Sequence, residues 1–136
     1  MALQTKEEIE QIAEVLRKTA DAIHERLMKA IIDEEIEQRE AQLIFNDEVL
    51  LRQQCNSLYI DAINCVVADL SQSQAAVTAT INAAKKTIKT VQNITVFIDL
   101  VADLLLLAAA IYAAKPAPIV GALKEIKDDI AALPAQ

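Results

Sequence analysis

The first 115 residues of the chain contain neither proline nor glycine, the two residues that most strongly interrupt helices. They are rich in Ala, Leu, Glu, Ile, Gln and Lys, and their apolar residues do not alternate with a period of two over any long stretch. The sequence therefore predicts an all-α protein. At 136 residues it has the size of one helical domain, spanning residues 1–136.

Capping signals place the helix boundaries where breakers are missing. Thr5 and Glu8 have the spacing of a capping box, and Asn46 between Phe45 and Asp47 can cap a new helix. A weaker break of the same kind lies at 71–74, and two prolines, at 116 and 118, end the preceding helix. We predict an elongated antiparallel bundle of three to four helices, at about 6–44, 47–70, 72–114 and 119–132, and expect it to form oligomers.

Residues 94–114 form a segment apolar and long enough to cross a bilayer, interrupted only by Asp99 and Asp103. Its eleven Ile, Val, Leu and Phe residues favour insertion by roughly 3 to 7 kcal/mol. Two aspartates near the middle of a span oppose insertion by about 2.5 to 3.5 kcal/mol each. The two contributions nearly cancel, so the segment is a marginal membrane span.

The two aspartates lie on one polar stripe. At 100° per residue, the stripe residues fall within roughly 40° of one line down a helix, and the opposite side is apolar. This pattern fits either the solvent-exposed edge of a buried helix or the lining of a water-filled path in a membrane. The stripe comprises Gln92, Thr95, Asp99 and Asp103, and the predicted membrane or oligomer face comprises Phe97, Ile98, Val101, Leu104, Leu105, Ala108 and Ile111.

A second apolar seam follows the prolines. Ile119, Leu123, Ile126 and Ile130 repeat at intervals of four, three and four, which is the heptad spacing of a coiled coil. Such a helix needs an apolar surface to pack on, and the segment just before it is the nearest candidate. We therefore predict an apolar hairpin at 94–132, with its turn at 115–118.

Composition narrows the classes of partner. Hydrophobic residues make up 54% of the chain, which favours self-association into a homo-oligomer. The formal net charge of −7 argues against nucleic-acid binding, which requires a basic surface. The N-terminus lacks the pattern of a cleavable secretory signal. We expect cytoplasmic synthesis, followed by possible membrane association or export without a cleavable signal.

No pattern in the chain predicts catalysis. His24 is the only histidine, so the paired Glu-x-x-His motifs of carboxylate-bridged metal centres cannot form within one chain. Phosphate-binding loops need several glycines, and the chain has one. Cys55 and Cys65 have apolar neighbours, which is typical of buried structural thiols. We predict a protein that is not an enzyme and that has no metal and no cofactor.

Three functions remain open. The first is a membrane-active protein that inserts its 94–132 hairpin into a lipid bilayer. In plan, this architecture resembles the α-helical pore-forming toxins, and the resemblance implies an apolar hairpin held inside a soluble bundle until insertion. The second is a structural or scaffold protein that buries the same segment permanently in a homo-oligomeric bundle, ring or filament. The third is an adaptor that binds a partner protein helix through the seam at 119–133.

Overall fold

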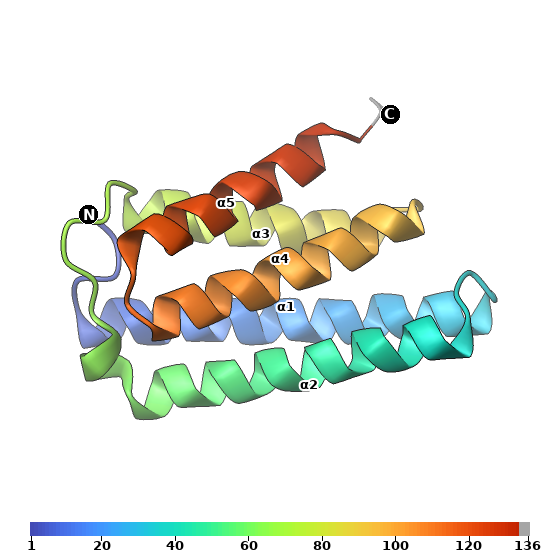
Figure 1. Cartoon of the computed structure of the whole chain (residues 1–136), viewed down its shortest axis with the longest axis horizontal. Helices are drawn as coiled ribbons and strands as arrows, with labels where there is room; N and C mark the ends of the chain where they lie inside the picture. Colours follow the sequence, from blue (N-terminus) through green and yellow to red (C-terminus); the bar gives the residue numbers. More distant parts are fainter. Residues whose placement is uncertain (134–136) are drawn as a thin grey trace.

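The computed structural model describes residues 1–133, and all regular structure within them is helical (Figure 1). There are five α-helices and one short 3-10 helix in this part of the chain, and the all-α prediction is confirmed. In chain order they are α1 (Lys6–Ile32), α2 (Gln38–Ile60), the 3-10 helix η1 (Ala62–Cys65), α3 (Gln74–Thr90), α4 (Ile94–Tyr112) and α5 (Pro116–Ala131).

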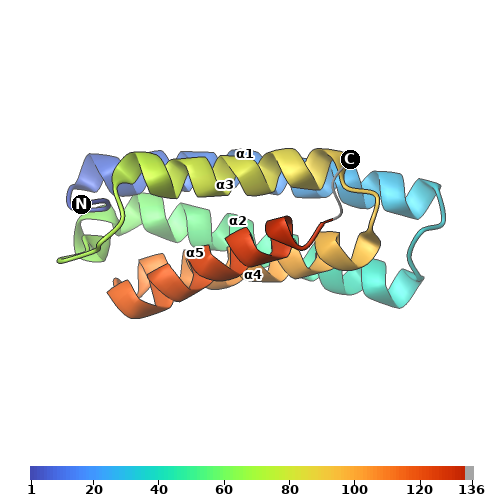
Figure 2. The ribbon, with the colours of Figure 1, turned by 90° about the horizontal axis from the view of Figure 1, so that it is seen from above.

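The helices lie side by side along the long axis of the molecule (Figures 1 and 2). Helices α1 and α2 form an antiparallel pair; α3 packs along α1, and α4 packs along α2. Helix α5 folds back on α4 and also contacts α3. In both views the outer end of the α1–α2 pair, where the two helices are joined, projects beyond the turn between α3 and α4.

One core runs through all the helices. An apolar stripe of α1, spaced by three, four and seven residues, lies in this core: Ile9, Ile12, Leu16 and Ile23 are fully buried. The last position of that stripe, Ile31, is 43% exposed. The stripe therefore leaves the core where α1 extends beyond α3 and α4.

The predicted break at residues 45–47 is wrong, as are the predicted helices 6–44 and 47–70. Helix α1 ends at Ile32, and Glu34 takes a left-handed conformation with φ of 56°. A reciprocal capping box between Glu37 and Glu40 then starts α2. Asn46 lies inside α2, where its side chain accepts a hydrogen bond of 3.2 Å from the Gln42 amide instead of capping a helix.

The weaker predicted break at 71–74 is confirmed, because Ser73 caps α3 by accepting a hydrogen bond of 3.0 Å from the Ala76 amide. The helix predicted at 72–114 is in fact two helices. Asn93 caps α4 through its side chain, which separates α3 from α4. Before α3, the chain leaves helical geometry after Cys65 and pairs with the N-terminal segment, where the Val67 amide donates to the Leu3 carbonyl at 2.8 Å.

The last helix begins earlier than the predicted residue 119. Pro116 occupies the first turn of α5, where a missing N–H costs no intrahelical hydrogen bond. The turn between α4 and α5 is correspondingly short and contains Ala114 in a left-handed conformation with φ of 55°. The two helices lie antiparallel and pack on each other, as the predicted hairpin requires.

Candidate functional site

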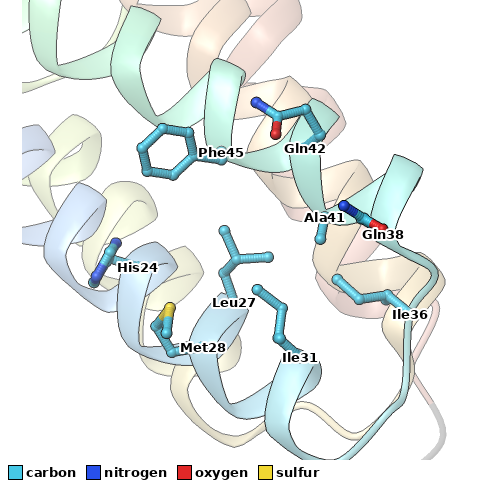
Figure 3. Close-up of a pocket in the computed structure, with 9 residues that line it drawn as sticks. All are labelled: His24, Leu27, Met28, Ile31, Ile36, Gln38, Ala41, Gln42 and Phe45. Carbon is cyan, nitrogen blue, oxygen red and sulfur yellow. The ribbon is translucent and has the colours of Figure 1, made fainter.

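An apolar groove of about 360 Å³ lies at the outer end of the α1–α2 pair (Figure 3). Side chains of both helices and of the connection between them form its walls. They are His24, Leu27, Met28 and Ile31 from α1, Ile36 from the connection, and Gln38, Ala41, Gln42 and Phe45 from α2. We call this feature the α1–α2 groove.

The two walls have matching spacings. The α1 residues follow one another at three, one and three positions, and the α2 residues do the same. Each set therefore forms one face of its helix, two turns long. Figure 3 shows Phe45 on the α2 wall across the groove from His24 and Leu27 on the α1 wall. The floor is Leu27, which is 1% exposed.

Exposed apolar side chains concentrate around this groove. Three of its lining residues, Met28, Ile31 and Phe45, are each 43% exposed. Two other large apolar residues near the same end of the pair, Ile32 and Leu43, are also exposed. A cluster of this kind on a water-soluble surface marks an interaction site more often than a scattered set does.

A polar network closes the inner end of the groove. The Glu48 carboxylate is buried and lies 3.0 Å from Nδ1 of His24. Its other oxygen accepts a hydrogen bond of 3.0 Å from Nε of Arg52, and that guanidinium also donates to Asp21 at 2.8 Å. Because these bonds join α1 to α2, they set the distance between the two walls of the groove.

Arg26 of α1 makes a second set of polar contacts at the outer end of the α1–α2 pair. Its side chain is buried, and two guanidinium nitrogens each donate to the Glu35 carboxylate at 3.1 Å. Nε donates to the carbonyl of Val91 at 3.1 Å, and the guanidinium lies 5.5 Å from the ring centre of Phe97. The hydrogen bond from Arg26 holds the pKa of Glu35 below its usual value. Arg26 thus links the segment between α1 and α2 to the turn between α3 and α4.

The predicted membrane or oligomer face of α4 lies largely in the core. Phe97, Val101, Leu104, Ala108 and Ile111 are buried, whereas Ile98 and Leu105 are half-buried. Helix α4 is long and apolar enough to cross a membrane, and it is the only described helix that meets both criteria. The structure covers half of its most apolar window.

The predicted polar stripe does not form one continuous edge. Gln92 lies in the turn before α4, outside the helix, and is exposed. Thr95 and Asp99 are also exposed, but Asp103 is buried where α5 covers α4. There it lies close to Glu125 and Asp129 of α5. The structure thus separates one aspartate of the stripe from solvent.

The predicted seam of α5 is in contact with the rest of the chain. Ile119, Leu123 and Ile126 are buried in the common core, and Ile130 is half-buried against it. These side chains face the helices on which α5 packs, α4 and α3. A partner helix could therefore reach the seam only if α5 moved away.

Both cysteines are buried, as the sequence predicts. Burial raises the pKa of the Cys55 thiol to about 11. Burial also raises the pKa of Cys65, whose thiol is 3.7 Å from the carbonyl oxygen of Tyr112 and donates to it. Both groups are held as neutral thiols, which are poor nucleophiles and poor metal ligands.

Sequence reasoning missed the α1–α2 groove because it placed a helix break at Phe45 and continued the first helix through residues 33–37. No apolar periodicity marks the groove, because three of its eight helical lining residues, His24, Gln38 and Gln42, are polar. In the comparisons with known proteins, the chain matches no protein-family model, and no curated protein or solved structure shows a significant match.

Proposed function

We propose that the protein is a non-enzymatic helical binding protein whose α1–α2 groove receives an amphipathic helix of a partner protein. The observation that carries this proposal is the groove itself, with five exposed large apolar side chains at the same end of the molecule. Exposure of this much apolar surface in one place is unfavourable in water, and a partner that covers it gains that free energy on binding.

The shape of the groove favours a helix as the occupant. Its walls are two antiparallel helices, and each wall is two turns long. A third helix laid along such a groove inserts apolar residues at positions i, i+3, i+4 and i+7. At 1.5 Å per residue, two to three turns of the partner, about 11 to 16 Å, are enough to fill it.

The charge around the groove favours a basic partner. Residues 24–48 contain eight acidic and three basic residues. One of the three bases, Arg26, is buried and already bound to Glu35. We therefore expect lysine or arginine residues beside the apolar stripe of the partner helix. A second copy of this chain would bring the same acidic surface and be repelled.

Two other functions remain predictions. A membrane-active hairpin is supported by the composition of α4, but insertion would require α4 to leave α2 and expose the core. A homo-oligomeric scaffold is supported by the apolar content of the chain. The membrane function requires α4 to contact lipid, and the scaffold function requires contact between copies of the chain. Vesicle binding and oligomeric state therefore distinguish these two functions from the proposed one.

The direct test uses designed peptides as probes of the groove. One peptide of 18 residues carries leucine at i, i+3, i+4 and i+7 with flanking lysines; a second has glutamate in place of each lysine. Fluorescence anisotropy with the full chain should show binding of the lysine peptide and at least about tenfold weaker binding of the glutamate peptide. Equal binding of the two peptides would contradict the proposed charge preference.

A matched pair of variants locates the binding site. Phe45→Ser removes a groove side chain that is 43% exposed, and Ile60→Ser removes an apolar side chain at the other end of α2 that is 81% exposed. We expect Phe45→Ser to weaken binding of the lysine peptide at least tenfold and Ile60→Ser to leave it unchanged. Equal effects of the two substitutions would overturn the assignment of the groove.

Vesicle flotation and light scattering test the other two functions. If the chain floats with vesicles of neutral lipid and Leu106→Asp on the exposed side of α4 abolishes flotation, the membrane function replaces the proposed one. If the chain forms an oligomer that Phe45→Ser dissociates, the groove is a self-association surface. A monomer that ignores vesicles and binds the lysine peptide supports the proposal.

A further inference from the structure

Three carboxylates meet between α4 and α5. Asp103 comes from α4, and Glu125 and Asp129 come from successive turns of α5. One oxygen of each carboxylate lies within 4.8 Å of the others. Three like charges at this separation repel one another strongly unless a proton or a cation lies among them.

Asp103 is the central member of this carboxylate cluster. It is 8% exposed, and its Oδ2 is buried without a hydrogen-bond partner among residues 1–133. None of the salt bridges found within these residues involves Asp103, Glu125 or Asp129. A buried carboxylate oxygen with no donor is costly, so its retention here needs a physical reason.

The charges around Asp103 also favour a positive ion in the cluster. Asp129 and Glu125 face Asp103 from α5, and Asp99 adds a further negative charge from α4. Negative charges gathered this closely favour a positive ion among them. A proton satisfies one oxygen only, whereas a metal ion can bind all three carboxylates at once.

We propose that Asp103, Glu125 and Asp129 form a binding site for a divalent cation of the calcium type. Carboxylate oxygens are the ligands that hard cations prefer. Calcium binds oxygen at 2.3 to 2.6 Å, so opposite ligands of one ion lie about 4.6 to 5.2 Å apart. All three oxygens lie within 4.8 Å of one another, which is inside the upper limit of this range. Magnesium demands near-ideal octahedral geometry and gives up its bound water reluctantly, so it should bind this site more weakly.

The position of the site gives the ion a structural role. Two of its ligands are on α5 and one is on α4, so a bound ion fastens the two helices of the hairpin together. Three carboxylates leave the remaining coordination positions to water, which predicts a weak site. The inference is independent of the α1–α2 groove, which lies on different helices.

The test measures calcium binding and thermal unfolding of the full chain at pH 7.5. With 10 mM CaCl2, and with NaCl at matched ionic strength as reference, we expect one bound ion per chain by isothermal titration calorimetry. We also expect the midpoint of thermal unfolding to rise by about 4 °C or more. MgCl2 at the same concentration should produce a smaller rise.

Three variants assign the effect. Asp103→Asn and Glu125→Gln should each abolish the calcium-dependent rise and the stoichiometric binding, and Glu125 is exposed enough that its variant should fold normally. Asp128→Asn is the control, because Asp128 lies next to the cluster but pairs with Lys124. Failure of the wild-type chain to bind calcium at 10 mM would overturn the proposal, and so would an equal loss in Asp128→Asn.

Discussion

The apolar helix α4 and the outer end of the α1–α2 pair differ in how much of their apolar surface the rest of the chain covers. Helix α4 is the most hydrophobic segment of the chain, yet its large side chains lie mainly in the core. The outer parts of α1 and α2 are richly charged, yet they leave several large apolar side chains exposed. The hydropathy of a segment therefore indicates how much surface must be covered, and does not indicate where surface remains uncovered.

The helices that pack against each region explain why α4 is covered and the outer end is not. Helix α4 has α2 on one side and α5 on another, with further contacts to α3 and α1. At the outer end, α1 and α2 have passed the turn between α3 and α4 and have only each other. Apolar residues at core spacing, such as Ile31 and Phe45, consequently remain open there.

The two phenylalanines of the chain test this contrast directly and give the largest expected effect. Phe97 in α4 is fully buried, whereas Phe45 is 43% exposed. We expect Phe97→Ala to lower the free energy of unfolding by about 3 to 5 kcal/mol, because it leaves a cavity in the core. Phe45→Ala should change it by about 0.5 kcal/mol or less. Urea denaturation measures both, and equal losses would show that the outer end belongs to the core after all.

Arg26 joins the two regions, and its removal should have the next largest effect. Arg26→Met keeps much of the side-chain volume but leaves the Val91 carbonyl and Glu35 without their donor. We expect a loss of about 2 to 3 kcal/mol in the free energy of unfolding, since hydrogen bonds to charged groups are the stronger ones. The control is Arg17→Met, which breaks an exposed pair with Glu14 and should therefore cost much less. A similar loss in both variants would remove any special role for Arg26.

Asp103→Asn should stabilise the protein at pH 8 in the presence of a chelator, by about 1 to 3 kcal/mol. Burial, and after it the neighbouring carboxylates, raise the pKa of Asp103 from 3.8 to about 8 in the folded chain. The stabilisation that protonated Asp103 provides is therefore largest below pH 4 and is lost as the pH rises through about 8. The wild-type chain should therefore lose stability across this window, and the variant should lose less. Urea denaturation at pH 5, 6.5 and 8 checks the slope; identical slopes would contradict the buried, charge-repelled state of Asp103.

The smallest expected effect is a gain at Gly121, on the exposed side of α5. A Cβ built at this position meets no atom within 4 Å, so alanine fits without strain. Because glycine lowers helix stability, we expect Gly121→Ala to raise the free energy of unfolding by about 0.5 to 1 kcal/mol. Thermal unfolding followed by circular dichroism measures the gain, and a loss would indicate that α5 bends at this residue.

The absence of helix breakers predicted the helical class, and the heptad spacing after the prolines predicted the pairing of α4 with α5. The connection at 33–37 escaped prediction because its signals are weak. Glutamate is not a favoured capping residue, and a left-handed Glu34 cannot be inferred from its identity. Asn46 is a favoured capping residue and wrongly predicted a helix start, because α1 has already ended at Ile32.

The candidate sites escaped prediction for a different reason. The burial of Asp103 depends on α5 folding over one side of α4, and sequence spacing does not reveal which side is covered. The α1–α2 groove likewise depends on where α3 and α4 stop relative to α1. Both features arise from the relative lengths and positions of helices that are distant in sequence.

The burial of both native cysteines makes the wild-type chain a convenient background for fluorescent labelling. Because Cys55 and Cys65 are buried and their pKa values are raised, they should react slowly with maleimides under native conditions. A single new cysteine at the exposed position of Gln42, on the rim of the groove, would then take up the dye selectively. Its emission would report, in real time and without removal of either native thiol, the arrival of whatever occupies the groove.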